Sequence, residues 1–335
     1  MSIIKIMETI RKEDFDKLSF KKIDEKVEYI NTYKPLFEDI IRDLNKGIDI
    51  DYVRQSEGIE TNTCNLYKLP EKCINYKVLR CEPALPKNFQ ECFKTKESYL
   101  DFIENQYKKS DLIISYKDEN GKNTFDILKT PSHLSSVGFA LAQARQDHKI
   151  LNTTKSIPNV ESSFIEKVNA HLFEEKLQFG SIMGYGSFRG LMYYNGTWLK
   201  SNVKLADNAW EASDAETVYD DINELIDKYN NSTLHPIAKA ILFKVRFTKI
   251  HPFRDGNGRT SRILLNYMLA RYGYPTITIY AHQREEYIKA MDTAILENNY
   301  KPLISMITKA LNERCDLYIK AIRTNLAGQK TDLNP

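Results

Sequence analysis

Hydrophobic positions recur along most of the chain at the three- and four-residue spacing of amphipathic helices. Before the midpoint, this spacing runs from Ile23 to Leu44, with breaks at Pro35 and before Gly47, and a further short helix is predicted from about Asp49 to Glu60. It returns from Val160 to Leu177, in a helix that we expect to end near Gly180. The second half predicts further helices over about 218–229, 237–245, 257–272, 284–296 and 303–322. The pattern therefore predicts a mainly α protein.

Two segments depart from this pattern and predict β-hairpins. Asn120-Gly121 separates apolar runs between Leu112 and Leu128. Asn195-Gly196 separates two short β-prone runs rich in aromatic residues, and it gives the clearest hairpin signal in the chain. We expect the residues after Asn325 to form a loose tail.

Composition narrows the class of protein. The 335 residues carry a formal net charge of +3, and the lysines are spread through the chain, so neither a nucleic-acid partner nor a membrane partner is indicated. No signal-peptide pattern or membrane-spanning run is present, which favours a cytoplasmic protein. Five cysteines at 64, 73, 81, 92 and 315 form no C-x-x-C pair, a pattern that suits free thiols better than disulfides or a zinc site.

The most distinctive stretch is residues 250–262, Ile-His-Pro-Phe-Arg-Asp-Gly-Asn-Gly-Arg-Thr-Ser-Arg, between two apolar helices. A loop that enters a helix N-terminus offers unpaired backbone N–H groups and the positive end of a dipole, which together suit an anion such as phosphate. Gly256 and Gly258 allow close approach of an anion to the backbone. Arg259 and Arg262 lie three residues apart on the same helix face and could bind successive phosphates.

The remaining polar residues of this stretch suit the same chemistry. Asp255, a carboxylate among cations, is a candidate Mg²⁺ ligand beside the phosphates. His251 could accept a proton from a hydroxyl at neutral pH. Taken singly, a helix-end histidine, a glycine turn and a helical arginine pair each have a structural explanation. Their convergence within twelve residues favours a functional site.

His251 to Arg262 matches in full the Fic signature H-x-F-x-[DE]-G-N-G-R-x-x-R, so the chain resembles Fic-domain proteins. The resemblance extends from about residue 155 to 315, whereas the first 150 residues resemble the family only at one short segment. It implies a Fic-type helical bundle with a β-hairpin flap and an additional, mostly helical N-terminal region. We therefore expect an N-terminal region at 1–150 that carries an inhibitory segment at 49–62, a Fic catalytic domain at 151–325 and a flexible tail at 326–335.

The resemblance also implies residue roles. His251 would be the general base, Asp255 would hold Mg²⁺, and Gly256-Asn257-Gly258 would bind the α- and β-phosphates of ATP, with Arg259 and Arg262 on the β- and γ-phosphates. The flap would register an extended segment of the target by main-chain hydrogen bonds. Its residues include Tyr193, Tyr194, Thr197 and Trp198.

Recognition of the base is less well defined by the sequence. Tyr287 is a candidate for nucleobase contact, with core packing as the alternative. Lys244 stands where relatives often carry histidine, and Ile295 stands where they can carry a polar residue.

Ser56 to Glu60 is similar to the inhibitory motif of the family, [ST]-x-x-x-E followed by Gly or Asn. Glu60 would pair with Arg262 and so withhold the γ-phosphate ligand. The chain departs from the motif at Thr61, although Asn62 follows at once. The alternative is a chance match on a solvent-exposed helix.

The resemblance implies a Mg²⁺-dependent protein adenylyltransferase, which transfers AMP from ATP to a Ser, Thr or Tyr hydroxyl of a target protein and is inhibited by Glu60. Self-modification and homo-oligomers are compatible with this interpretation. One alternative is an enzyme that also removes AMP, with Glu60 as the base for water. Others are an ATP-binding regulatory module with vestigial transfer, which has no need of His251, and a kinase-like orientation of the nucleotide, which the loop sequence disfavours.

Overall fold

The computed structural model describes residues 17–60, 77–79, 112–117, 123–128, 131–173, 186–189, 191–194, 197–200 and 210–331. Its helices are α2 (Lys17–Tyr33), α3 (Glu38–Glu60), α5 (Pro131–Thr154), α6 (Ser162–Leu172), α8 (Val218–Asn230), α9 (Pro236–Ile250), α10 (Asn257–Ala270), α11 (Arg284–Leu296) and α12 (Lys301–Thr331), with 3-10 turns η2 (Lys34–Phe37) and η6 (Ala281–Gln283). Its strands are β1 (Lys77–Leu79), β2 (Leu112–Lys117), β3 (Asn123–Leu128), β4 (Leu191–Tyr194) and β5 (Thr197–Lys200). The prediction of a mainly α fold is confirmed.

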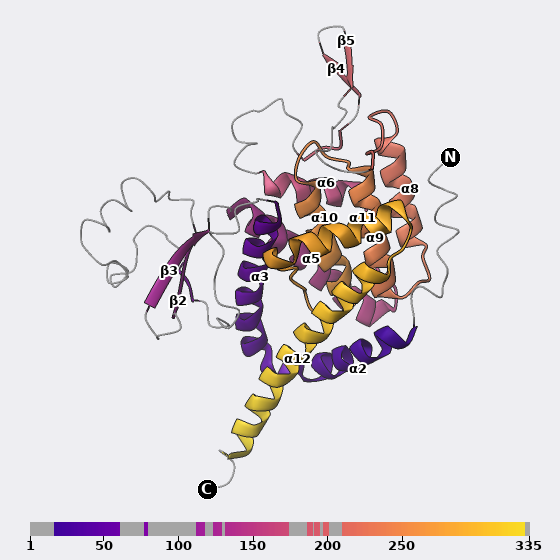
Figure 1. Ribbon diagram of the computed structural model, residues 1–335. Helices are drawn as coiled ribbons and strands as arrows, with labels where there is room; N and C mark the ends of the chain where they lie inside the picture. The colour runs from indigo at the N-terminus through magenta and orange to yellow at the C-terminus, as the bar shows by residue number, and fades with distance from the viewer. Residues whose placement is uncertain are drawn as a thin grey trace, which may run out of the picture.

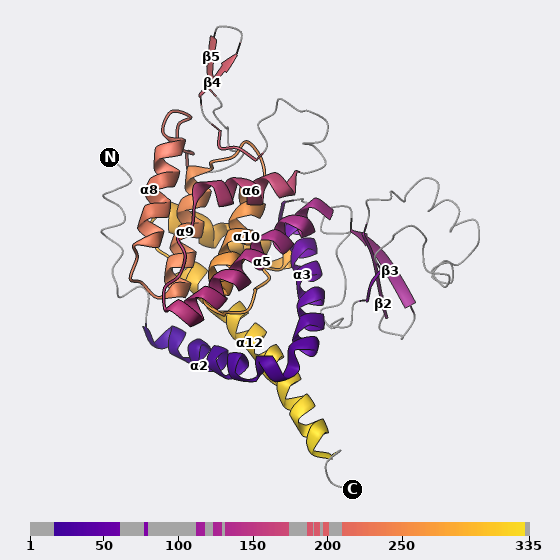
Figure 2. The same cartoon turned by 180° about the vertical axis from the view of Figure 1, so that it is seen from behind.

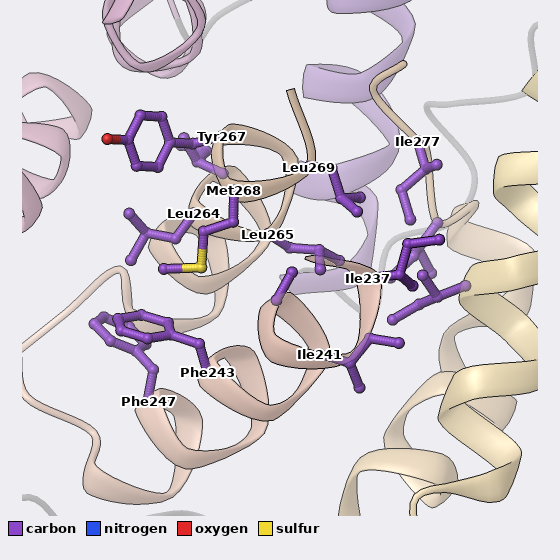
Figure 3. Packing of buried hydrophobic residues seen from close by; sticks show 14 of the residues in the cluster. Ile237, Ile241, Phe243, Phe247, Leu264, Leu265, Tyr267, Met268, Leu269 and Ile277 are labelled. Carbon is purple, nitrogen blue, oxygen red and sulfur yellow. The ribbon is translucent and has the colours of Figure 1, made fainter. Parts of the chain in front are cut away.

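Helices α9 and α10 form the centre of the bundle, and the other long helices surround them (Figure 1). Both are apolar on most sides, as helices inside a bundle must be. Phe243 and Phe247 of α9 lie near Leu264 and Met268 of α10, as Figure 3 shows, and all four are buried. Each such side chain contributes about 1.5–3 kcal/mol by leaving water. The helices that flank the motif loop are therefore held rigidly.

Helix α5 was not predicted. It packs against α3, α6 and α10 and is seen with α6 on the side of the bundle shown in Figure 2. Its buried face mixes Val137, Ala140 and Leu141 with the polar residues His133 and Asp147, which weakens the apolar periodicity. The division placed at residue 150 falls inside this helix, and one continuous hydrophobic cluster joins the N-terminal helices to the helices of the second half.

Two helices are longer than the sequence predicted. Helix α3 continues through Gly47, which is buried. Helix α12 continues to Thr331, with Leu326 packed against the core, so the tail predicted from residue 326 begins too early. The helix predicted over Val160–Leu177 is observed as α6 up to Leu172, and residues 174–185 lie outside the described part of the chain.

Two small antiparallel sheets accompany the helices. Strands β1, β2 and β3 form one sheet in that order, with Leu112 opposite Leu128. Strands β4 and β5 form a hairpin that stands clear of the helices (Figure 1) and pairs Tyr193 with Trp198 and Tyr194 with Thr197. The Asn-Gly steps predicted for both turns, 120–121 and 195–196, lie outside the described residues.

Candidate active site

The loop between α9 and α10 begins with a sharp change of direction at His251. This residue has a left-handed backbone conformation (φ 54°), and Pro252 follows it. Arg189 stabilises the turn from a distant part of the sequence, because its Nε donates to the His251 carbonyl (2.7 Å) and its Nη2 donates to the Ile250 carbonyl (3.1 Å). A cation at the carbonyl end of a helix is favourable. The position of His251 is therefore fixed by α9, Pro252 and Arg189 together.

The His251 imidazole is held in its neutral form. Burial, followed by the positive charge of Arg189, lowers the pKa of His251 to about 4. At neutral pH the ring is unprotonated and able to accept a proton.

Internal hydrogen bonds determine the shape of the rest of the loop. The Asn257 side chain accepts from the Phe253 N–H (2.8 Å) and donates to the Phe253 carbonyl (2.7 Å). The buried Asn169 of α6 donates to the Asp255 carbonyl (3.1 Å). Gly256 has φ 78°, and a Cβ there would collide with Phe173. The Asn257 side chain thus shapes the loop, and an anion would meet backbone N–H groups instead.

The first turn of α10 offers such an anion site. The helix begins at Asn257. Its N-cap residue is Gly256, which has no side chain to accept a hydrogen bond from the first backbone N–H groups. The Glu60 carboxylate, at the end of α3, reaches this turn. A Cβ at Gly258 would collide with Glu60 Oε1, so only glycine permits this close approach. A negatively charged group of this protein therefore already lies at the predicted phosphate-binding turn.

Arg262 is bound by the same segment of α3. Its Nη2 donates to Glu60 Oε1 (2.7 Å) and to the Ser56 carbonyl (2.9 Å), and its Nε donates to Ser56 Oγ (2.9 Å). The Arg262 side chain is only 4% exposed and that of Glu60 is 39% exposed. Desolvation opposes ionisation of Glu60, but Arg262 outweighs it and holds the pKa of Glu60 below its usual value. The predicted contact of Glu60 with Arg262 is present, and the bonds from Arg262 to Ser56 add to it. Thr61 and Asn62 lie outside the described residues.

Arg259 lies between two carboxylates. Its Nη1 is 3.4 Å from Glu57 Oε1, and its Nη2 is 3.5 Å from Asp255 Oδ1. Its guanidinium also lies 5.2 Å from the centre of the Phe173 ring. Both motif arginines are thus engaged by glutamates of α3.

Asp255 is the one motif carboxylate that fits a divalent cation. Its side chain is 48% exposed, and its Oδ1 accepts from the Gly256 N–H (2.6 Å). Within the described part of the chain, no group of three or more His, Cys, Asp or Glu side chains could hold a metal ion. A single carboxylate near a phosphate site suits Mg²⁺, which takes its other ligands from phosphates and water.

Tyr287 is placed differently from an exposed nucleobase platform. It is 5% exposed, and the buried Lys244 donates to its hydroxyl (2.6 Å) and to Ser261 Oγ (3.1 Å). Burial alone would raise the pKa of Tyr287. The positive charges of Lys244 and Arg262 have the larger effect, so the pKa of Tyr287 is lowered overall. This arrangement favours a supporting role beneath Arg262. Ile295 is buried in the core.

Apart from Tyr287 on α11, the predicted site residues fall into three groups. His251, Asp255, Gly256, Asn257, Gly258, Arg259 and Arg262 lie on one loop and helix start, and α3 brings Ser56 and Glu60 to them. The strands that contain Tyr193, Tyr194, Thr197 and Trp198 form the separate β4–β5 hairpin. Sequence reasoning missed Arg189, Asn169, Glu57 and His133, each of which is a buried polar residue. For Asn169 and His133, an isolated polar residue on an apolar helix face was the only local signal.

Comparison with known proteins identifies the proteins that this chain resembles. Residues 159–269 match the Fic/DOC family. The protein named "Protein adenylyltransferase Fic" of Drosophila melanogaster is 27% identical over 206 residues, which are 59% of this chain and 40% of the relative. Its Drosophila willistoni namesake is 41% identical over 91 residues, 27% of this chain and 18% of the relative. The chain thus spans less than half the length of these curated relatives.

Solved structures share the fold. A Fic-domain-containing signalling protein of Bacteroides thetaiotaomicron has a TM-score of 0.58 at 20% identity, over 91% of this chain and 98% of the other. Fic-1 (residues 134–508) of C. elegans has a TM-score of 0.53 at 17% identity, over 93% of this chain and 74% of the other. At these identities the likeness concerns the fold alone. Residues 159–269 of the chain therefore form a Fic/DOC-family domain.

Proposed function

We propose that the chain is a protein adenylyltransferase, which transfers AMP from ATP to a Ser, Thr or Tyr hydroxyl of a target protein and rests in a state inhibited by Glu60. The names of the similar Drosophila proteins support this class of activity. The observation that carries the proposal is the Glu60 carboxylate, which lies over Gly258 and binds Arg262. A site that already accepts a carboxylate suits the phosphates of a nucleotide.

His251 would perform the proton transfer. In this proposal, its neutral ring takes the proton of the target hydroxyl as the hydroxyl oxygen attacks the α-phosphorus. The bond from the α-phosphorus to the bridging oxygen breaks, and pyrophosphate leaves with the electron pair. The depressed pKa of His251, at about 4, keeps the ring in the form that this step requires at neutral pH.

The phosphates would be bound by α10. The backbone N–H groups of its first turn and the guanidinium groups of Arg259 and Arg262 would neutralise the phosphate charge. Asp255 would hold Mg²⁺, which when bound would neutralise part of the negative charge of the phosphates. Glu60 competes directly with this arrangement because its Oε1 lies 2.7 Å from Arg262 Nη2. ATP must therefore displace Glu60 before both arginines can bind phosphate.

The other parts of the chain would then have distinct tasks. Residues 151–325 would form the catalytic unit, and residues 49–62 would form its built-in inhibitor. The β4–β5 hairpin would receive an extended segment of the target by main-chain hydrogen bonds, a common way to add a strand. The protein itself is one candidate acceptor of AMP.

Two differently labelled forms of ATP test the activity. The purified chain, with and without a cell lysate, is incubated with Mg²⁺ and ATP labelled at the α- or the γ-phosphate, and wild type is compared with Glu60→Gly. We expect protein-bound label from the α position alone, and more of it with Glu60→Gly. Glu38→Gly at the opposite end of α3 is the control and should match wild type. Label from the γ position, or no label with any variant, would contradict the proposal.

A further inference from the structure

Helix α3 carries a second carboxylate into the site, one turn before Glu60. Glu57 is 9% exposed, although it is a glutamate on a helix that reaches the surface at both ends. Its Oε1 is shared between two partners, Arg259 Nη1 of α10 (3.4 Å) and His133 Nδ1 of α5 (2.7 Å). The motif similarity gave no role to this position, because it falls among the unspecified residues between Ser56 and Glu60.

The partner of Glu57 on α5 is more deeply buried still. His133 is 1% exposed, and its Nε2 has no hydrogen-bond partner among the described residues. Without a hydrogen-bond partner, a buried unprotonated Nε2 costs less free energy than a buried Nε2–H donor would. The geometry therefore suits a neutral ring that donates from Nδ1–H to an ionised Glu57.

The electrostatic environment agrees with these protonation states. Burial lowers the pKa of His133, and the attraction of Glu57 only partly offsets this effect. Burial opposes ionisation of Glu57, but the hydrogen bond from His133 and the charge of Arg259 outweigh it and lower the pKa of Glu57. Glu57 is thus a full negative charge placed beside Arg259.

We propose that Glu57 is a second inhibitory carboxylate, which His133 holds in place and which occupies Arg259 while Glu60 occupies Arg262. This inference rests on the proposed function, since it assumes that Arg259 is a phosphate ligand. Each motif arginine then has its own glutamate from α3, one helical turn apart. Glu57 is a regulatory residue, whereas His133 is a positioning residue that acts through it.

Two separate contacts make inhibition graded. Removal of Glu60 alone takes away the carboxylate partner of Arg262, whose hydrogen bonds to Ser56 remain. Helix α3 also stays attached through the contact of Glu57 with His133 and through the Arg284 Nε bond to the Ile59 carbonyl (2.8 Å). A nucleotide would still compete with Glu57 for Arg259. Full release requires that both glutamates withdraw. The two effects should therefore be coupled, because the residues are neighbours on one helix and each lies in the field of both arginines.

Nucleotide binding tests this proposal without dependence on transfer. The probe is α,β-methylene ATP with Mg²⁺, which cannot give up AMP, and calorimetry measures its affinity for the full chain. We expect roughly fivefold tighter binding for Glu57→Gln than for wild type, roughly tenfold for Glu60→Gly, and at least the product of the two for the double variant, because only there is α3 released from both arginines. Glu38→Gln, which removes a charge at the far end of α3, is the matched control and should bind as wild type.

The outcomes separate this inference from the function on which it rests. If Glu60→Gly binds more tightly but Glu57→Gln equals or falls below wild type, Glu57 is not inhibitory and the proposed function stands. If no variant binds the analogue, both ideas are wrong. Circular dichroism establishes that each variant is folded before it is measured.

His133 provides an independent arm. His133→Ala removes the hydrogen-bond donor to Glu57 and so weakens the attachment of α3 to α5. Glu57 then competes less well for Arg259, and affinity for the analogue should rise several-fold. His133→Asn supplies an amide donor close to the position of Nδ1 and should retain wild-type affinity. Amide hydrogen exchange over residues 51–60 should accelerate in His133→Ala and not in His133→Asn. Equal exchange in all three proteins would overturn the role given to His133.

Discussion

His251 combines two properties that a proton acceptor needs, a fixed position and a neutral ring. His251→Ala removes the acceptor but leaves α10 and both arginines in place, so we expect AMP transfer to fall by about a hundredfold or more. Affinity for ATP should stay within about threefold of wild type, because the ring acts on the hydroxyl rather than on the phosphates. Both are measured in the Glu60→Gly background, where transfer is fastest. Near-normal transfer in the variant would exclude His251 as the base.

The pKa of His251 gives a prediction on pH. An ordinary histidine titrates at about 6.5, and that of His251 is lowered to about 4 by burial and by Arg189. NMR titration of the ring in the free chain should therefore find His251 neutral throughout pH 5–8. Below pH 6.5 the unfolded chain binds a proton at this histidine more readily than the folded chain does. The free energy of unfolding is therefore unaffected by His251 above pH 6.5 and falls as pH decreases from 6.5 through about 4. A measured pKa near 6.5 would contradict the buried environment.

Individual site residues differ in how far sequence could predict them. His251 to Arg262 were predictable because the whole group is contiguous in the chain, so a single loop and helix start carry it. The Asn257 side chain was not, because its bonds to Phe253 depend on the folded loop. Glu57 and His133 are 76 residues apart and meet only when α3 packs on α5. No local pattern reports such a contact.

At the scale of elements, α3 acts as a unit because three of its last five residues reach α10. Glu60→Gly removes one charge-assisted contact, of the kind worth about 1.5–3 kcal/mol, and should raise the rate of AMP transfer roughly tenfold or more. Arg262→Ala should stay inactive, because it removes the phosphate ligand along with the partner of Glu60. The variant that combines both changes should be inactive as well.

Initial rates of AMP incorporation for these four proteins test the inhibitory helix. Equal rates for wild type and Glu60→Gly would mean that the docked position of α3 does not limit the enzyme. Activity of Arg262→Ala above wild type would instead show that Arg262 serves only the inhibited state.

Most helices of the second half were predictable, since α8, α9, α10 and α11 have regular apolar spacing and clear ends. Helix α5 was not, because His133 and Asp147 occupy buried positions where the spacing calls for apolar residues. The break expected near Gly47 was also wrong, since packing of α3 keeps this buried glycine helical. Tertiary contacts decide these elements, and they outweigh local propensity.

At the scale of the whole molecule, no helix of the described part of the chain is both long and apolar enough to cross a membrane.

Helix α5 ties the N-terminal helices to the Fic domain. The tie includes a buried ion pair, in which Arg271 Nε donates to Asp147 Oδ2 (2.7 Å) and the two side chains are 1% and 2% exposed. Tyr267 donates to the same oxygen (2.9 Å), and Arg271 also donates to the Pro158 carbonyl. These bonds connect α5, α10 and the segment before α6.

This ion pair yields a prediction on stability. Arg271→Met leaves Asp147 as a buried charge without its cation, and such losses cost about 3–5 kcal/mol in free energy of unfolding. The double variant Asp147→Leu/Arg271→Met removes the stranded charge and should regain most of that loss, because an apolar pair of similar volume replaces the ion pair. The control is Glu224→Gln, which breaks the partly exposed pair with Lys228 on α8 and should change stability by less than about 1 kcal/mol. Urea unfolding followed by circular dichroism measures all four proteins, including wild type. If Arg271→Met were no less stable than Glu224→Gln, the pair would not hold α5 to the Fic domain.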